Sequence, residues 1–213
     1  MDVRGVITDW GGVLTNPIAE TVNAWLAADG IDRDRYMTVM RQWVSQAYDP
    51  QADDNPIHAL ERGESSLTEF EMALASELVL VDGGPVAGEG LLSRMWAATK
   101  LDDTMLEVFR RLHDLGVPTG LLSNSWGNGY PRELFAERFD AVVISCEVGM
   151  RKPESRIFLH AAELLGLEPA ECVFIDDIAA NITAAEQLGF TGVLHTDTAT
   201  TRQRLSELLG IDL

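Results

Sequence analysis

The residue in this chain with the clearest chemical potential is Asp9, in the stretch TDWGGVLTNP. It follows an apolar run (3–8) that has the length of a buried strand, and Gly11 and Gly12 come next. Removing an unpaired carboxylate from water is costly. We therefore expect Asp9 to have a cationic partner, a bound metal ion or a catalytic role.

Polar side chains of useful chemistry also follow three later apolar runs, at 118–123, 141–145 and 172–176. They are Ser123, Asn124, Lys152, Asp176 and Asp177. In open α/β sheets the active site forms where the carboxyl ends of the strands meet. We therefore expect these side chains to gather around Asp9.

Three acids in one crevice repel one another, and a divalent cation with a preference for oxygen ligands, such as Mg²⁺, relieves that repulsion. Lys152 supplies a point charge suited to a phosphoryl oxygen. Ser123 supplies a hydroxyl, and the amides that follow it can complete an anion-binding nest. With a carboxylate nucleophile, this set describes phosphoryl transfer through an aspartyl-phosphate.

Five short apolar runs have the length of strands, and longer helical patterns separate most of them. The predicted strands are 3–8, 118–123, 141–145, 172–176 and 192–196, and the predicted helices between them are 103–115, 154–165 and 179–188. Strands that alternate with helices indicate an α/β fold. We expect a doubly wound, Rossmann-like parallel sheet with helices on both faces.

The segment 16–97 does not follow this alternation and is helical throughout. Asn16-Pro17 is typical of a helix start, and Gly30 ends the first apolar stripe. The stretch 68–71 (TEFE) predicts a capping box at a later helix, and 48–56 predicts a loop between helices. We therefore expect a core domain of 1–15 and 98–213, with a helical domain of 16–97 inserted after the first strand.

Composition limits the classes of partner. The 213 residues carry a formal charge of −18, which argues against binding the backbone of nucleic acid but not against a small anion. The chain has no 18-residue apolar run and no signal-peptide pattern, so we expect a cytoplasmic protein without a membrane partner. Cys146 and Cys172 lie in apolar stretches and are expected to be buried, reduced thiols. The sequence predicts no oligomeric state.

Taken together, the motifs TDWGGV, LLSNS, VGMRKPE and VFIDD followed by NITAAEQLG resemble, in order, the four signature motifs of the haloacid dehalogenase superfamily, most of whose members are phosphatases. The helical insert takes the place of that family's C1-type cap. The resemblance implies that Asp9 is nucleophile and metal ligand. It implies further roles for the other motif residues: the Gly11 carbonyl, Asp176 and Asp177 hold Mg²⁺, while Ser123 and Lys152 hold the phosphoryl group. Trp10, Gly11 and Asn124, which adjoin signature residues, are expected to contact substrate.

The sequence departs from the family at Gly11. Phosphatases of the family typically have there a second Asp, a general acid and base, and such help is worth roughly two to four orders of magnitude in rate. An acidic leaving group, as in a sugar 1-phosphate or an acyl phosphate, needs less protonation. Three hypotheses follow. The first is a magnesium-dependent phosphatase of small organic phosphates; the others are a metal-independent 2-haloacid dehalogenase using Asp9 and a non-catalytic protein that binds a phosphate ligand.

Overall fold

The computed structural model describes residues 3–47, 55–127 and 129–213, so most of the loop predicted at 48–56 lies outside the described residues. The chain divides into two compact units. The α/β unit comprises Met1–Pro17, Lys100–Asn124 and Tyr130–Leu213, and the helical unit comprises Ile18–Thr99 and Ser125–Gly129.

A five-stranded parallel sheet forms the centre of the α/β unit. Its strands are β1 (Gly5–Thr8), β2 (Thr119–Ser123), β3 (Ala141–Ile144), β4 (Cys172–Asp176) and β5 (Thr191–Leu194), in the order β3-β2-β1-β4-β5. The central strand β1 pairs with β2 on one side and with β4 on the other. This confirms the predicted parallel α/β sheet, with all five strands at the expected places.

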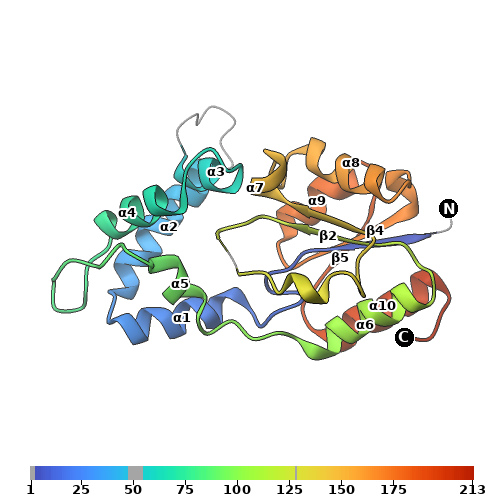
Figure 1. Cartoon of the computed structure of the whole chain (residues 1–213), viewed down its shortest axis with the longest axis horizontal. Helices are drawn as coiled ribbons and strands as arrows, with labels where there is room; N and C mark the ends of the chain where they lie inside the picture. The colour runs from blue at the N-terminus through green and yellow to red at the C-terminus, as the bar shows by residue number, and fades with distance from the viewer. Residues whose placement is uncertain (1–2, 48–54, 128) are drawn as a thin grey trace. The chain divides into compact units, whose positions relative to one another are not determined.

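Helices cover both faces of this sheet (Figure 1). Helices α6 (Asp103–Asp114) and α10 (Thr198–Leu209) lie on one face, and α8 (Ser155–Leu164) and α9 (Ala179–Gln187) lie on the other. Shorter pieces connect these elements: α7 (Ser145–Val148), η1 (Arg132–Leu134) and η2 (Pro169–Glu171). The crossover from β3 to β4 passes the central strand, so the carboxyl ends of β1 and its neighbours form a topological switch point.

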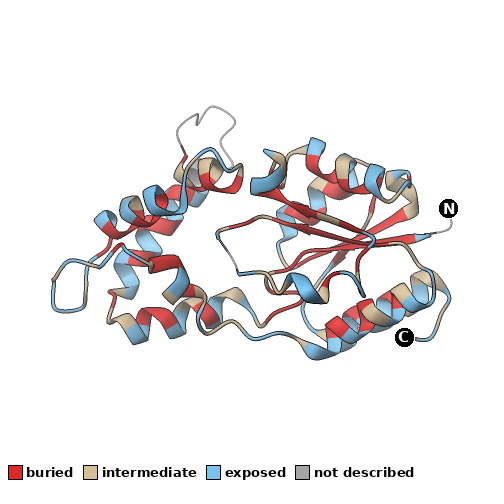
Figure 2. Ribbon diagram, in the orientation of Figure 1, coloured by how far each residue is buried: buried red, intermediate tan, exposed pale blue. Residues whose placement is uncertain are grey.

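The central strands β1, β2 and β4 are buried on both faces, which explains why they appear in the sequence as continuous apolar runs, whereas the edge strand β5 is partly exposed (Figure 2). Alternate side chains enter separate cores: Val6 and Val173 pack toward α6 and α10, whereas Ile7 and Phe174 pack toward α8 and α9. This alternation follows from the period of two of a strand.

The predicted burial of the cysteines is correct for Cys172, on β4, and wrong for Cys146, which is exposed. The reason is that β3 ends at Ile144. The chain then turns into α7, which carries Cys146 on its surface.

In its described residues, the longer piece of the helical unit contains five helices. They are α1 (Ile18–Asp29), α2 (Arg33–Ala47), α3 (Pro56–Glu61), α4 (Leu67–Glu77) and α5 (Leu91–Trp96). They enclose a core of their own, whose fully buried members include Phe70, Leu74, Leu91 and Met95. None of the helices in the described ranges is long and apolar enough to cross a membrane.

The capping box predicted at 68–71 is two residues out of place. The observed N-cap of α4 is Ser66, whose hydroxyl accepts from the Glu69 amide while the Glu69 carboxylate accepts from the Ser66 amide. Glu71 instead accepts from the backbone amides of Gly90 and Leu92, and so satisfies donors at the start of α5.

The short segment 125–129 clusters with the helices, although the sequence placed it in the core domain. Trp126 explains this clustering. Its ring packs edge-on against Phe70 at 5.3 Å, and its Nε1 donates to Glu61 at 2.8 Å. Its carbonyl accepts from Nε1 of Trp96 at 3.2 Å. The helical unit is therefore built from two separate pieces of chain.

Candidate active site

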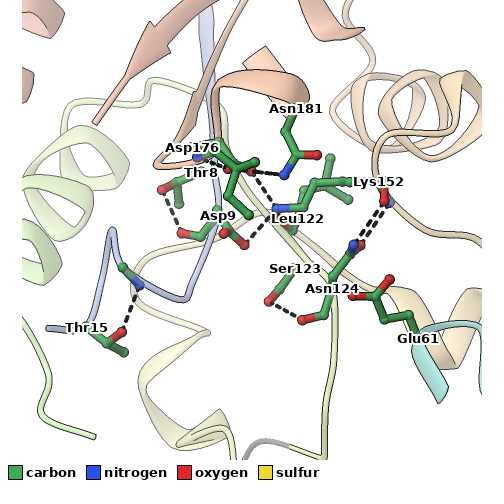
Figure 3. Close-up of polar contacts among 12 residues, drawn as sticks. Thr8, Asp9, Thr15, Glu61, Leu122, Ser123, Asn124, Lys152, Asp176 and Asn181 are labelled. Atoms are coloured by element: carbon green, nitrogen blue, oxygen red, sulfur yellow. Dashed lines mark hydrogen bonds and ion pairs between the residues drawn. The ribbon is translucent and has the colours of Figure 1, made fainter. Parts of the chain in front are cut away.

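Lys152 lies at the centre of a buried charge cluster at the carboxyl ends of the strands (Figure 3). Its Nζ is 2.8 Å from a carboxylate oxygen of Asp9 and 2.7 Å from one of Asp176, and it donates to the Leu122 carbonyl at 3.1 Å. The exposed fractions of Asp9, Lys152 and Asp176 are 7%, 1% and 0%. Three segments that are distant in sequence thus meet at the carboxyl ends of the strands.

Asn124 fixes the backbone of Lys152. Its side-chain oxygen accepts from the Lys152 amide at 2.8 Å, and its side-chain nitrogen donates to the Lys152 carbonyl at 3.0 Å. Both ends of the Asn124 amide are therefore used to hold the loop that carries the lysine. The structure thus gives Asn124 a positioning role, and its contact with substrate remains a prediction.

Asp176 has the most hydrogen-bond donors of the three clustered acids. One oxygen accepts from the Ile178 amide, the other from Lys152, and Nδ2 of Asn181 lies within 3.2 Å of both. Asn181 lies in the first turn of α9, five residues after Asp176. It belongs to the fourth motif, in NITAAEQLG, but its motif alone predicted no role for it.

Asp177 lies close against the turn that follows β1. A Cβ built on Gly12 would be 2.2 Å from Oδ2 of Asp177, which is too near for any real side chain. Gly12 also has a φ of +75°, a conformation that favours glycine, and its amide donates to Oγ1 of Thr15 at 3.0 Å. The second glycine of the motif thus lets the carboxylate of Asp177 approach the backbone beside Asp9.

The three acids fit a divalent cation. One oxygen from each of Asp9, Asp176 and Asp177 lies within 4.8 Å of the others. Carboxylate and carbonyl oxygens are the ligands that Mg²⁺ prefers, and it commonly uses one or two carboxylates with water and phosphate oxygens. Lys152 contributes one positive charge against these three acids, so ionised carboxylates here leave negative charge that a metal ion would balance.

Burial and mutual repulsion perturb the acids. Burial raises the pKa of Asp9 to about 7, although Lys152 opposes this increase and Asp176 adds to it. Burial, reinforced by Asp176, raises the pKa of Asp177 to about 6. Burial alone would lower the pKa of Lys152, but the attraction of Asp176 and Asp9 outweighs it and raises the pKa above the usual value. The lysine therefore stays charged, whereas two acids lie near their protonation points at neutral pH.

Ser123 ends β2 with an exposed fraction of 1%, and its Oγ lies 3.0 Å from the hydroxyl of Tyr130, a residue for which the sequence predicted no role. Trp10 packs in the core, where its ring contacts those of Tyr130 and Phe135 edge-on at 5.7 Å. The ring of Trp10 is only 3% exposed, so its observed role is packing. Contact of Trp10 with a substrate remains a prediction.

Comparison with known proteins places these features in a family context. A family model of haloacid dehalogenase-like hydrolases matches residues 3–189. Bifunctional epoxide hydrolase 2 of Sus scrofa is 25% identical over 100% of this chain, which covers 40% of that protein. Flavin mononucleotide hydrolase 1 of Arabidopsis thaliana is 29% identical over 66% of this chain and 60% of its own length. Sesquiterpene phosphatase astK of Aspergillus oryzae is 31% identical over 51% of this chain and 58% of its own length.

Solved structures of similar fold cover nearly the whole chain. A haloacid dehalogenase-like family hydrolase from Porphyromonas gingivalis superimposes with a TM-score of 0.65 at 25% identity, covering 96% of this chain and 98% of that one. An enzyme of the same family from Bacteroides thetaiotaomicron, solved in complex with magnesium and inorganic phosphate, gives a TM-score of 0.60 at 23% identity, covering 91% of this chain and 94% of that one.

Proposed function

The chain belongs to the haloacid dehalogenase-like hydrolases, and we propose that it is a magnesium-dependent phosphatase of small organic phosphates. The observation that carries this proposal is the buried contact of Asp9 with Lys152 at 2.8 Å, next to two further carboxylates. A carboxylate nucleophile, a fixed cation and a cluster of oxygen ligands together suit phosphoryl transfer.

In the proposed reaction, an oxygen of ionised Asp9 attacks the phosphorus of the substrate. A phosphorus–oxygen bond forms to Asp9, and the bond to the leaving group breaks, with the electron pair going to the leaving oxygen, which takes a proton from solvent because Gly11 offers no general acid. Water then attacks the same phosphorus and gives up a proton to solvent. The bond to Asp9 breaks, its electron pair returns to the carboxylate, and inorganic phosphate leaves. Lys152 favours the ionised form of Asp9 that the first step needs.

The clustered acids Asp9, Asp176 and Asp177 are suited to hold Mg²⁺. We assign the ion to the carboxylates of Asp9 and Asp177 and to the Gly11 carbonyl, because the carboxylate of Asp177 lies against the turn of Gly11 and Gly12. Asp176 already accepts hydrogen bonds from Lys152 and Asn181. We assign it either to holding Lys152 in place or to serving as a further ligand of Mg²⁺. When bound, the ion balances the charge of the acids and of the phosphoryl oxygens.

The relatives support this proposal through their names. One is a sesquiterpene phosphatase and one a flavin mononucleotide hydrolase, and a structural relative holds magnesium with inorganic phosphate. For this chain, phosphate monoesters as substrates, a cytoplasmic location and the lack of nucleic-acid and membrane partners remain predictions.

Gly11 favours a second candidate, a phosphate-binding protein without turnover, because it leaves the usual general-acid position without a side chain. For an active enzyme, the missing general acid at Gly11 favours substrates with an acidic leaving group, which needs less protonation. The third hypothesis, a metal-independent dehalogenase, gives no role to the approach of Asp177 to the nucleophile. Chloride release from a 2-chloro acid tests it directly.

The decisive experiment is a screen of phosphate monoesters and acyl phosphates, with and without Mg²⁺. We expect hydrolysis that a chelator abolishes, with Asp9→Asn reducing it by more than about a thousandfold because the nucleophile is lost. Asp34→Asn, an exposed change of the same kind on α2, is the matched control and should keep full activity.

Other outcomes separate the alternatives. Binding of Mg²⁺ with beryllium fluoride, without hydrolysis of any ester, would favour the binding protein. Turnover of a phosphate ester that persists in a chelator would contradict the proposed function.

A further inference from the structure

A tyrosine hydroxyl lies against the serine that is expected to hold the phosphoryl group. The Tyr130 hydroxyl is 3.0 Å from Oγ of Ser123, and either oxygen can be the donor. Ser123 also lies 3.5 Å from the Asn124 carbonyl, a longer and weaker contact. Of these two contacts, the one with Tyr130 is therefore the stronger.

The ring of Tyr130 is held in place by aromatic neighbours. It packs edge-on against Trp10 at 5.7 Å and against Phe135 at 6.3 Å. Trp10 directly follows Asp9, and Ser123 ends the neighbouring strand β2. Within the α/β unit, Tyr130 therefore contacts both Ser123, at the end of β2, and Trp10, just after β1.

Proton counting decides the direction of this hydrogen bond when an anion is present. Each hydroxyl has one proton to donate, and an ionised phosphoryl oxygen can only accept. If Ser123 donates to the anion, its Oγ can accept the proton of Tyr130. Such a chain of hydroxyls strengthens each bond along it. A serine without that partner is free to turn its proton toward the Asn124 carbonyl.

We propose that Tyr130 is a positioning residue that donates to Ser123 and so directs the serine proton toward the phosphoryl group. The inference rests on the proposed function of this site and deepens it. It predicts an effect on phosphoryl binding that operates only through the hydroxyl of Ser123.

The test is Tyr130→Phe, which removes the hydroxyl and keeps the ring. We expect kcat/KM for a phosphate ester to fall about 3- to 10-fold, with inorganic phosphate inhibiting less well by a similar factor, as for the loss of one hydrogen bond. Tyr36→Phe is the matched control, because it removes a hydroxyl from a buried tyrosine on α2 that packs against Trp25. It should leave both constants unchanged.

A double-mutant cycle separates positioning from simple packing. In a Ser123→Ala background, Tyr130→Phe should cause no further loss of kcat/KM, because the serine hydroxyl through which Tyr130 acts is absent. An equal loss in both backgrounds, or wild-type kinetics for Tyr130→Phe, would overturn the proposal.

Failure of the proposed function can be told apart from failure of this inference. If the wild type hydrolyses no ester, calorimetric binding of inorganic phosphate to the Mg²⁺-loaded protein replaces the kinetic assay. Weaker binding by Tyr130→Phe, but not by Tyr36→Phe, supports the positioning role. Unchanged binding by Tyr130→Phe overturns the positioning role alone, whereas no binding of phosphate by the wild type overturns the proposed function and this inference with it.

Discussion

At the scale of single residues, the energetics of this site centre on one buried lysine. Lys152 is 1% exposed and lies between two buried carboxylates. Removing one partner from a buried ion pair leaves charge without compensation in a medium that solvates it poorly. The stability of the α/β unit therefore depends on the same group that is expected to hold the phosphoryl oxygens.

Replacing this lysine tests that dependence. We expect Lys152→Met to lower the free energy of unfolding by about 3 to 5 kcal/mol, because Asp9 and Asp176 lose their shared cation. Chemical denaturation of the metal-free protein at pH 8 measures the effect. Lys100→Met, which changes an exposed lysine in the same way, should stay within about 0.5 kcal/mol of the wild type. Equal stabilities of the two variants would contradict the charge argument.

The residues that the sequence identified were those whose type is unusual at the end of an apolar run. Acids such as Asp9 and Asp176, and a lysine expected to face them, stand out because burying them is costly. Asn181 and Tyr130 did not stand out, because an amide or a phenol is common in helices and loops. Their partners depend on where α9 begins and on how the ring packs, which the spacing of residues does not reveal.

At the scale of elements, the turn after β1 is shaped for the end of β4. Gly12 combines a φ of +75° with the close approach of Asp177. The turn and the acid pair therefore form one structural feature, although more than 160 residues separate them in the chain.

Gly12→Ala should disrupt this feature in two ways. The left-handed φ strains alanine by roughly 1 to 2 kcal/mol, and the new Cβ meets the carboxylate of Asp177. We expect loss of stability together with at least a tenfold loss of Mg²⁺ affinity by calorimetry. Gly30→Ala carries a similar φ of +65° with no atom within 4 Å, so it should lose stability alone. Wild-type Mg²⁺ affinity in Gly12→Ala would refute the clash.

The sequence predicted the strands well because parallel strands buried on both faces appear as uninterrupted apolar runs. It predicted the start of α4 less well. Two capping-box patterns overlap there, one from Ser66 to Glu69 and one from Thr68 to Glu71, and both satisfy the sequence rule. The choice depends on the donors at Gly90 and Leu92, which engage Glu71 and lie about twenty residues away.

At the scale of the whole molecule, the protein is strongly acidic, with a formal charge of −18, and its candidate site concentrates acids further. The pKa values of Asp9 and Asp177, raised to about 7 and about 6, lie above the usual value near 3.9. The folded state thus binds more protons than the unfolded state between about pH 4 and pH 7. Because of this site, metal-free stability should fall as the pH rises through that window.

Magnesium should reverse this trend, because it binds the ionised carboxylates and competes with protons. We expect saturating Mg²⁺ to raise Tm by roughly 5 to 10 °C at pH 8, and by less at pH 5.5. Calorimetric or fluorescence melting measures both, with a chelator as the reference. Asp177→Asn should remove most of the increase at pH 8. An increase of the same size at both pH values would show that these acids do not hold the ion.

The tryptophan at position 126 has a consequence for building hybrid proteins. Because the helical unit includes Ser125–Gly129 as well as Ile18–Thr99, the unit is not a single removable cassette. An exchange of 18–99 alone with the matching segment of a relative would take away Phe70 and Glu61, which contact the indole of Trp126, and Trp96, which donates to its carbonyl. A functional chimera must therefore take both pieces, 18–99 and 125–129, from the same parent.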